Sequence, residues 1–164
     1  METSLQVRLV FKLAVCAAFV AGAVCFCKSV QAGEARTYVG SEKCGECHAD
    51  EYESYKANAK KAHSFASIKR MKKFLSDKEF QSCCVCHTLG YGQPGGFRSE
   101  TETPELKNLG CETCHGPGSL HVELGNGKNI DKDFSEAMCM ACHTKDRSVA
   151  FRFRPSMFGG THNK

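Results

Sequence analysis

The sequence predicts a mainly α-helical fold with much irregular structure, in which short helices and loops leave little β-strand. A Cys-His motif recurs four times along the chain, and its spacing suits a single helical turn. Glycine-rich segments, such as residues 90–96 and 116–118, interrupt the chain and favour turns. The sequence contains 41% hydrophobic residues and no Trp. We therefore expect a thin conventional core, to which bound apolar groups would have to add buried surface.

The repeated motif has two cysteines three positions apart and a histidine directly after the second. C-x-x-C-H is the attachment signature of haem c. The two sulfurs lie on one face of a helical turn and can bond to the two vinyl groups of one porphyrin. The histidine then binds the iron as proximal ligand. The four copies are Cys44-Gly-Glu-Cys47-His48, Cys83-Cys-Val-Cys86-His87, Cys111-Glu-Thr-Cys114-His115 and Cys139-Met-Ala-Cys142-His143.

The cysteine pairs allow two alternative interpretations, zinc binding and disulfide formation. Two C-x-x-C pairs can hold zinc, and an exported chain can use cysteines in disulfides. Neither explains a histidine in the same place in all four copies. We therefore expect four covalently attached haems c, with iron bound by His48, His87, His115 and His143. We expect four haems in the predicted mature chain, residues 33–164, to pack closely against one another, and closely packed haems conduct electrons.

The other three histidines, His63, His121 and His162, are candidate distal ligands. A low-spin haem iron usually takes two axial ligands, so four irons and three spare histidines leave one position unfilled. Methionine is the alternative ligand, and Met71 and Met157 are the candidates. The Gly-Pro-Gly turn after His115 could direct His121 toward a neighbouring haem.

The first 32 residues are predicted to be a cleaved secretory signal. Arg8 and Lys12 precede an apolar run from Leu13 to Phe26, and small residues end the segment at Ala32. The run is short for a membrane span, although an uncleaved anchor is the alternative. The functional part would be a single domain, residues 33–164. We expect it in the periplasm, with the outer surface as a second location.

The net charge of +4 is small and argues against nucleic acid as a partner. Haem propionates would make the mature protein more acidic. One basic cluster stands out before the second motif, and it is either a solvated helix face or a docking site for an acidic redox protein. Its members are Lys60, Lys61, Lys69, Arg70, Lys72 and Lys73.

Three helix starts are predicted from capping patterns: Asp50 with Glu53, Ser76 with Glu79, and Asp133 with Glu136. Cys84 is left over from the motif pairs. It is expected to be a small buried side chain, with a reactive thiol as the alternative.

The chain resembles the tetrahaem cytochrome c-554 family from about Tyr38 to His143. The resemblance rests on residues 83–96, on Gly110-Cys-Glu-Thr-Cys-His-Gly-Pro-Gly118 and on the opening segment from Tyr38 to His48. It implies that His121 caps the first haem, His63 the fourth and His162 the third. It also implies that the second haem, bound by His87, keeps an open face. The loop of residues 90–96 either shapes that pocket or is a surface turn.

The predicted function is the transfer of single electrons between a redox protein donor and a redox protein acceptor. The mature protein would be soluble and would make transient contact with membrane redox complexes. An enzyme is the alternative: the second iron, bound by His87 alone, could reduce a small molecule such as nitric oxide. A structural role in a haem filament or membrane complex is the third hypothesis.

Overall fold

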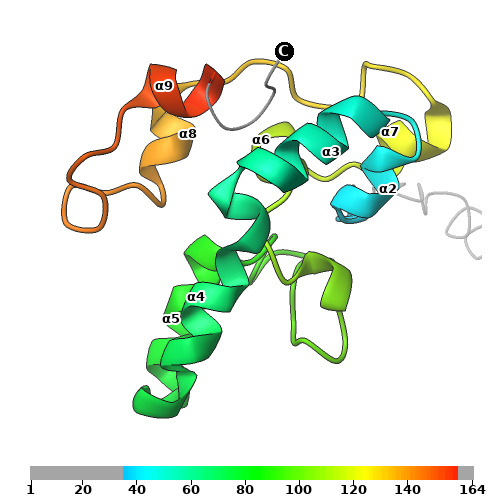
Figure 1. Cartoon of the computed structure of the whole chain (residues 1–164). Helices are drawn as coiled ribbons and strands as arrows, with labels where there is room; N and C mark the ends of the chain where they lie inside the picture. The colour runs from blue at the N-terminus through cyan, green and yellow to red at the C-terminus, as the bar shows by residue number, and fades with distance from the viewer. Residues whose placement is uncertain (1–34, 159–164) are drawn as a thin grey trace, which may run out of the picture. The chain divides into compact units, whose positions relative to one another are not determined.

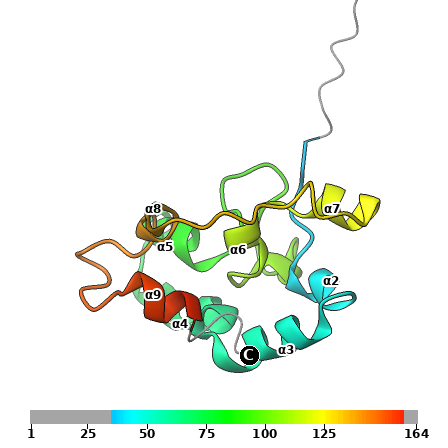
Figure 2. The same ribbon diagram turned by 90° about the horizontal axis from the view of Figure 1, so that it is seen from above.

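The computed structural model describes residues 35–158 as short helices joined by loops (Figures 1 and 2). The predicted signal peptide and His162 lie outside these residues. No strand occurs between residues 35 and 158, so the predicted fold class is confirmed. The α-helices are α2 Ser41–Gly45, α3 Ala49–Asn58, α4 Ser64–Met71, α5 Asp77–His87, α6 Glu112–His115, α7 Ser119–Leu124, α8 Glu136–Met140 and α9 Phe153–Phe158. The 3₁₀ helices are η1 Lys60–His63, η2 Lys72–Phe74 and η3 Pro104–Leu106.

Within the described range, every helix is too short or too polar to cross a membrane.

Helix α5 starts with the predicted capping box. The Ser76 backbone N–H donates to Glu79 Oε2 at 2.8 Å, and the Glu79 N–H donates to Ser76 Oγ at 3.4 Å. Hydrogen bonds from Ser76 lower the pKa of Glu79 because they favour the charged carboxylate. The box fixes the start of the helix that carries the second Cys-His motif.

The other two capping predictions name the wrong N-cap residue. Helix α3 begins at Ala49 with His48 in the N-cap position, because the first motif turns directly into this helix. Asp50 therefore lies in the first turn, where its charge still suits the helix dipole. Helix α8 begins at Glu136 with Ser135 as its N-cap, so Asp133 precedes the helix by two residues.

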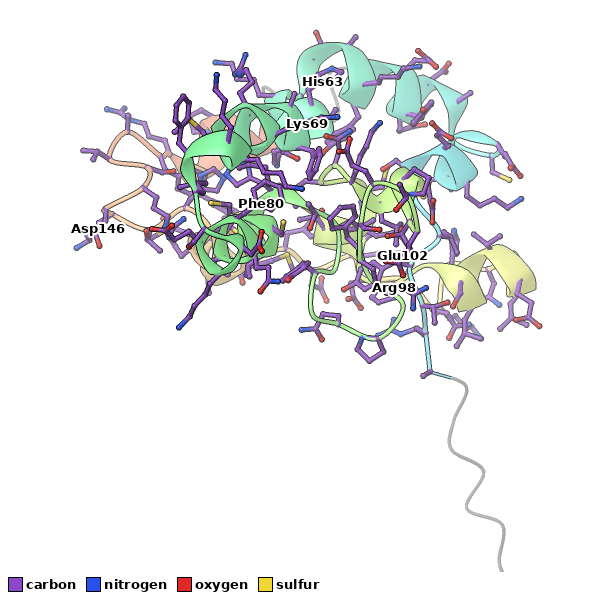
Figure 3. The ribbon with its side chains drawn as sticks, turned by 90° about the horizontal axis from the view of Figure 1, so that it is seen from below. His63, Lys69, Phe80, Arg98, Glu102 and Asp146 are labelled. Carbon is purple, nitrogen blue, oxygen red and sulfur yellow. The ribbon has the colours of Figure 1, made fainter. Side chains whose placement is uncertain are left out.

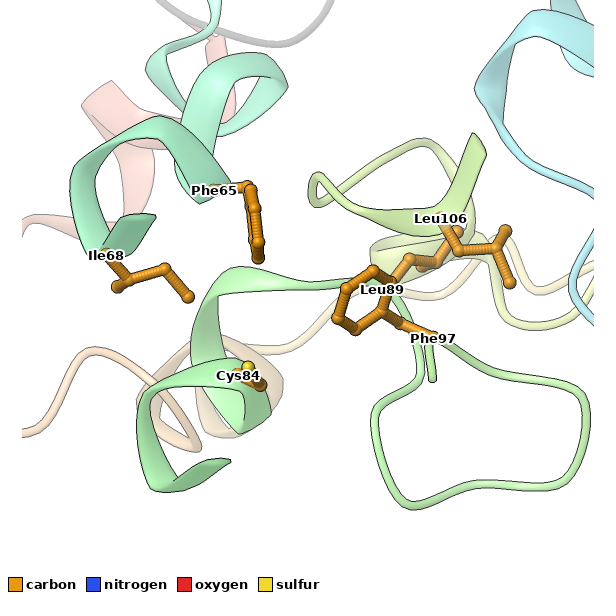
Figure 4. Close-up of a cluster of buried hydrophobic side chains, with 6 residues drawn as sticks. All are labelled: Phe65, Ile68, Cys84, Leu89, Phe97 and Leu106. Atoms are coloured by element: carbon orange, nitrogen blue, oxygen red, sulfur yellow. The ribbon is translucent and has the colours of Figure 1, made fainter. Parts of the chain in front are cut away.

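A small hydrophobic core lies between α4, α5 and the loop that follows α5 (Figure 4). Helix α4 packs against α5 (Figure 1). The ring centroids of Phe65 and Phe97 are 5.6 Å apart, and Phe80 (Figure 3) meets Phe65 edge-on. The core agrees with the expectation of thin conventional packing. Its buried members are Phe65, Ile68, Cys84, Leu89, Phe97 and Leu106.

Cys84 belongs to this core and is 2% exposed. It lies on α5, and burial is the main reason why the pKa of its thiol is raised. A buried thiol with a raised pKa is mostly protonated and unreactive. The observed position agrees with the interpretation of Cys84 as a small buried side chain.

The glycine-rich loop after α5 closes on itself. The Phe97 N–H donates to the Leu89 carbonyl at 2.8 Å, and the Leu89 N–H donates to the Leu106 carbonyl at 2.9 Å. Gly96 lies so close to Gly90 that a Cβ at residue 96 would overlap the Gly90 carbonyl oxygen. The close approach requires glycine and holds the loop against the core.

Replacement of Gly96 by Ala should destabilise the folded protein by about 3 kcal/mol, because the added carbon collides with backbone that cannot rotate away. Gly92→Ala is the matched control. Gly92 has φ +80° but open space around it, so Ala there should cost about 1 kcal/mol through backbone strain alone. Thermal unfolding of the mature protein measures both. Equal losses would contradict the proposed role of the Gly90–Gly96 contact.

Candidate haem-binding sites

All four Cys-His motifs adopt the same helical turn. In the first, third and fourth motifs, the histidine N–H donates to the carbonyl of the first cysteine at 2.9, 3.0 and 2.9 Å. The second motif forms the last turns of α5, which ends at His87. This turn places two sulfurs and one imidazole on a common side, which is the arrangement that attachment to one porphyrin requires. The described residues therefore fit the expected cofactor.

Three of the proximal histidines are held through Nδ1. His87 Nδ1 lies 3.1 Å from the Ser64 carbonyl oxygen, His115 Nδ1 lies 2.9 Å from the Asp131 carbonyl oxygen, and His143 Nδ1 lies 3.0 Å from Ser148 Oγ. A metal-bound histidine usually donates its other ring N–H in this way, which fixes the ring and its tautomer. The geometry directs Nε2 to the metal.

Hydrogen bonds from α4 hold the second motif at His87. Ser64 Oγ donates to the His87 carbonyl at 2.8 Å and accepts from the Leu109 N–H at 2.9 Å. Ser67 Oγ lies 3.3 Å from His87 Nδ1 and donates to the Ser64 carbonyl at 2.7 Å. Helix α4 therefore orients the imidazole of a neighbouring helix.

The fourth motif is supported by the segment that follows it. The rings of His143 and Phe151 stack with centroids 4.3 Å apart and an angle of 14° between their planes. Burial and the positive charge of Lys61 lower the pKa of His143, which favours the neutral imidazole that binds metals. The third motif has an aromatic neighbour too, since Phe134 meets the His115 ring edge-on at 4.9 Å.

His121 lies opposite His48. The ring centroids are 6.2 Å apart and the planes differ by 20°. Imidazole nitrogens bind a first-row metal at about 2 Å, so two rings on opposite sides of one iron have centroids about 6 Å apart. The His121 ring is held through Nδ1, 2.6 Å from the Asn126 carbonyl oxygen. Gly125 ends α7 with φ +59° and brings that carbonyl back to the ring. The spacing suits the first iron between His48 and His121.

The attachment cysteines come together across motifs. The thiols of Cys44 and Cys111 interact, which lowers the pKa of Cys111 and raises the pKa of Cys44, while Cys44 Sγ donates to the Gly40 carbonyl at 3.7 Å. Cys86 and Cys142 form a second such pair, and burial together with Cys86 raises the pKa of the Cys142 thiol to about 11. Sulfurs of the first and third motifs are thus neighbours, as are sulfurs of the second and fourth.

The comparisons with known proteins agree with this geometry. The family described as "Cytochrome c554 and c-prime" matches residues 43–116. Cytochrome c-554 of Nitrosomonas europaea is 36% identical over 137 residues, covering 65% of this chain and 57% of the relative. The structure of reduced cytochrome c554 from the same organism matches with a TM-score of 0.56 at 24% identity, covering 78% of this chain and 86% of that one.

The chain is therefore similar to the cytochrome c-554 family, with the family match confined to residues 43–116. The family is tetrahaem, and its members carry covalently bound c-type haems. The helical, strand-free fold of the described residues matches the cytochrome c554 fold. The chain spans little more than half the length of its curated relative, at 57%.

The two remaining candidate distal histidines are His63 and His162. His63 ends η1, and its Nε2 lies 3.1 Å from the Lys56 carbonyl oxygen. Binding of His63 to an iron therefore uses Nδ1 or requires the ring to turn. Lys61, in the same 3₁₀ helix as His63, is near enough to His143 for its charge to lower the His143 pKa, after burial as the main cause. His162 and the side chain of Met157 lie outside the described residues, and Met71 is exposed at the end of α4.

Sequence reasoning missed the groups that hold the histidines. Ser64, Ser67 and Ser148 carry no motif of their own, and serine is a common surface residue. Glu112 was also missed, although it lies inside the third motif and is 3% exposed. Its position between Cys111 and Cys114 was the available signal, but a glutamate is rarely buried.

Replacement of His121 by Ala should convert one further haem of the mature protein to the high-spin ferric state, because the iron opposite His48 loses its second axial ligand. Electron paramagnetic resonance measures the change. Val122→Ala on the same helix is the matched control and should leave the spectrum unchanged. An unaltered spectrum of His121→Ala would contradict the placement of His121 across from His48.

Proposed function

We propose that this chain is an exported tetrahaem electron carrier that moves single electrons between redox proteins. The observation that carries the proposal is the common helical turn of the four motifs, with three of the four histidines held through Nδ1. When bound, the haems supply the one-electron chemistry. The chain's own residues attach them, orient the proximal imidazoles and place the attachment points of different haems side by side.

We assign the anchors and ligands by motif. The attachment residues are Cys44, Cys47, Cys83, Cys86, Cys111, Cys114, Cys139 and Cys142, and the proximal ligands are His48, His87, His115 and His143. His121 is the distal ligand opposite His48, which the ring spacing supports. His63 and His162 are the distal ligands of the fourth and third haems, and His87 holds its iron without a second histidine.

The site of action follows from the chemistry. Residues 1–32 form the export signal and residues 33–164 the functional domain, because in bacteria haem c is attached outside the cytoplasm. The mature protein acts in the periplasm, and its partners are redox proteins. Nothing in the comparisons supports the nitric oxide reductase alternative, so the proposal is limited to electron transfer.

The direct test is the intact mass of the protein after expression in a host that attaches haem c. We expect the mass of residues 33–164 plus four haems, and a visible spectrum that changes reversibly on reduction with dithionite and reoxidation with ferricyanide. A double variant, Cys44→Ala with Cys47→Ala, should lose one haem mass and keep three. A mass equal to the bare polypeptide would refute the proposal.

The basic cluster supports a docking site for an acidic redox partner. Lys60, Lys69, Arg70, Lys72 and Lys73 are exposed, and Lys61 is partly buried. Lys69 pairs with Glu100 at 2.7 Å, so part of its charge is neutralised within the chain. Lys72 and Lys73 instead lie over the rings of Phe80 and Phe74, at 5.1 and 4.8 Å.

Exposed apolar side chains accompany these charges. Met71, which lies within the basic cluster, is 50% exposed, and Phe74, directly after Lys73, is 70% exposed. The basic cluster lies close to the second motif, because α4, which carries Lys69 and Arg70, packs against α5, which carries the motif. An apolar centre with a charged border is a common design of protein interfaces.

Reversal of two charges in this cluster, Lys72→Glu with Lys73→Glu, should slow electron uptake from a small acidic redox protein such as reduced flavodoxin. We expect a drop of about tenfold in the association rate at low salt, because steering by opposite charge is lost. Stopped-flow absorbance at several salt concentrations measures the rate.

The matched control is Lys128→Glu with Lys132→Glu, which gives the same change of net charge at exposed positions after α7. This control should change the rate far less. Equal slowing by both double variants would indicate an effect of net charge and would contradict a localised docking site.

A further inference from the structure

Glu112, the first residue of α6, is a buried carboxylate inside the third motif. It is 3% exposed and accepts hydrogen bonds from three backbone N–H groups. The Val39 N–H donates to Oε1 at 3.0 Å, the Gly40 N–H donates to Oε2 at 2.8 Å, and the Gly118 N–H donates to Oε1 at 2.8 Å. Both carboxylate oxygens are therefore satisfied by donors from distant parts of the chain.

These contacts suit an ionised carboxylate. An ionised carboxylate only accepts hydrogen bonds, whereas a protonated one also needs an acceptor for its O–H. All the partners named above are donors. Consecutive backbone N–H groups, as at Val39 and Gly40, form a concave anion-binding site. Burial of a charge is costly even when it is hydrogen-bonded, and a neutral residue would avoid that cost.

Glu112 lies between the first and third attachment turns. It follows Cys111 directly, and its partners Val39 and Gly40 lead into α2, which carries Cys44. The thiols of Cys44 and Cys111 are close enough to shift each other's pKa. The negative charge of Glu112 acts on both thiols: it adds to the raised pKa of Cys44 and opposes the lowering of the Cys111 pKa, so its field reaches both attachment points.

The other motifs have no comparable charge at this position. The residue after the first cysteine is Gly45, Cys84 or Met140 in the first, second and fourth motifs. The first motif does contain Glu46, but its side chain is 60% exposed and pairs with Lys43. Water and the lysine screen that charge. Glu112 thus gives a buried negative charge to one pair of motifs.

We propose that Glu112 sets the reduction potentials of the haems attached through the first and third motifs, lowering both by its fixed, buried negative charge. The inference rests on the haem assignment under Proposed function. Reduction adds one electron to the haem, and a nearby negative charge opposes it, more strongly in a low-dielectric interior. Net charge is one of the factors that set the potentials of protein-bound redox centres. Glu112 therefore biases electrons toward the second and fourth haems.

The test is a potentiometric titration of the mature tetrahaem protein, followed by visible and electron paramagnetic resonance spectra. Glu112→Gln removes the charge and keeps the size and one amide oxygen acceptor. It should raise the potentials of two haems, and the shift should persist at high salt because the charge is buried. Glu112→Asp keeps the charge and should leave the potentials low, even if the shorter side chain weakens the contacts. Glu46→Gln, the same change at an exposed motif residue, should leave all four unchanged.

Several outcomes would overturn the proposal. Equal shifts in Glu112→Gln and Glu112→Asp would indicate packing rather than charge, as would failure of both variants to mature with four haems. Unchanged potentials in Glu112→Gln would show that the charge has no effect. A wild-type protein that binds no haem would refute the proposed function itself, so the two failures can be told apart.

Discussion

The constraint on which the structure depends is that two sulfurs and one imidazole must face the same porphyrin in each of four short turns. Each turn needs only one helical hydrogen bond to form, from the histidine N–H to the first cysteine carbonyl. An isolated turn of this length is unstable in water. Contacts from other parts of the chain therefore stabilise these turns, and the helices between the turns are short.

The supports come from elsewhere in the chain rather than from a large core. Ser64 on α4 holds the second motif, Asp131 holds the third, and Ser148 holds the fourth. The hydrophobic cluster around Leu89 and Leu106 is small and lies on one side of the second motif. Haems attached at the motifs would add the buried apolar surface that the small core lacks, in agreement with the modest apolar content of the sequence.

The sequence predicted the features that depend on local spacing. The four motif turns, the Ser76–Glu79 box and the absence of strand among residues 35–158 all follow from patterns within a few residues. The starts of α3 and α8 were misplaced, because the motif turn and Ser135 occupy the N-cap positions instead. The partners of Glu112 and His87 could not be predicted, since they lie far away in sequence and are joined by the fold alone.

The mutual effect of the Cys44 and Cys111 thiols has a consequence for the export proposed above. In an oxidising compartment, a lowered thiol pKa favours the thiolate that starts disulfide exchange. A crosslink between these two cysteines would take one anchor from each of two cofactors at once. Biogenesis of this protein therefore depends on timing: the thiols must be kept reduced, or separated by an unfolded chain, until both porphyrins are attached.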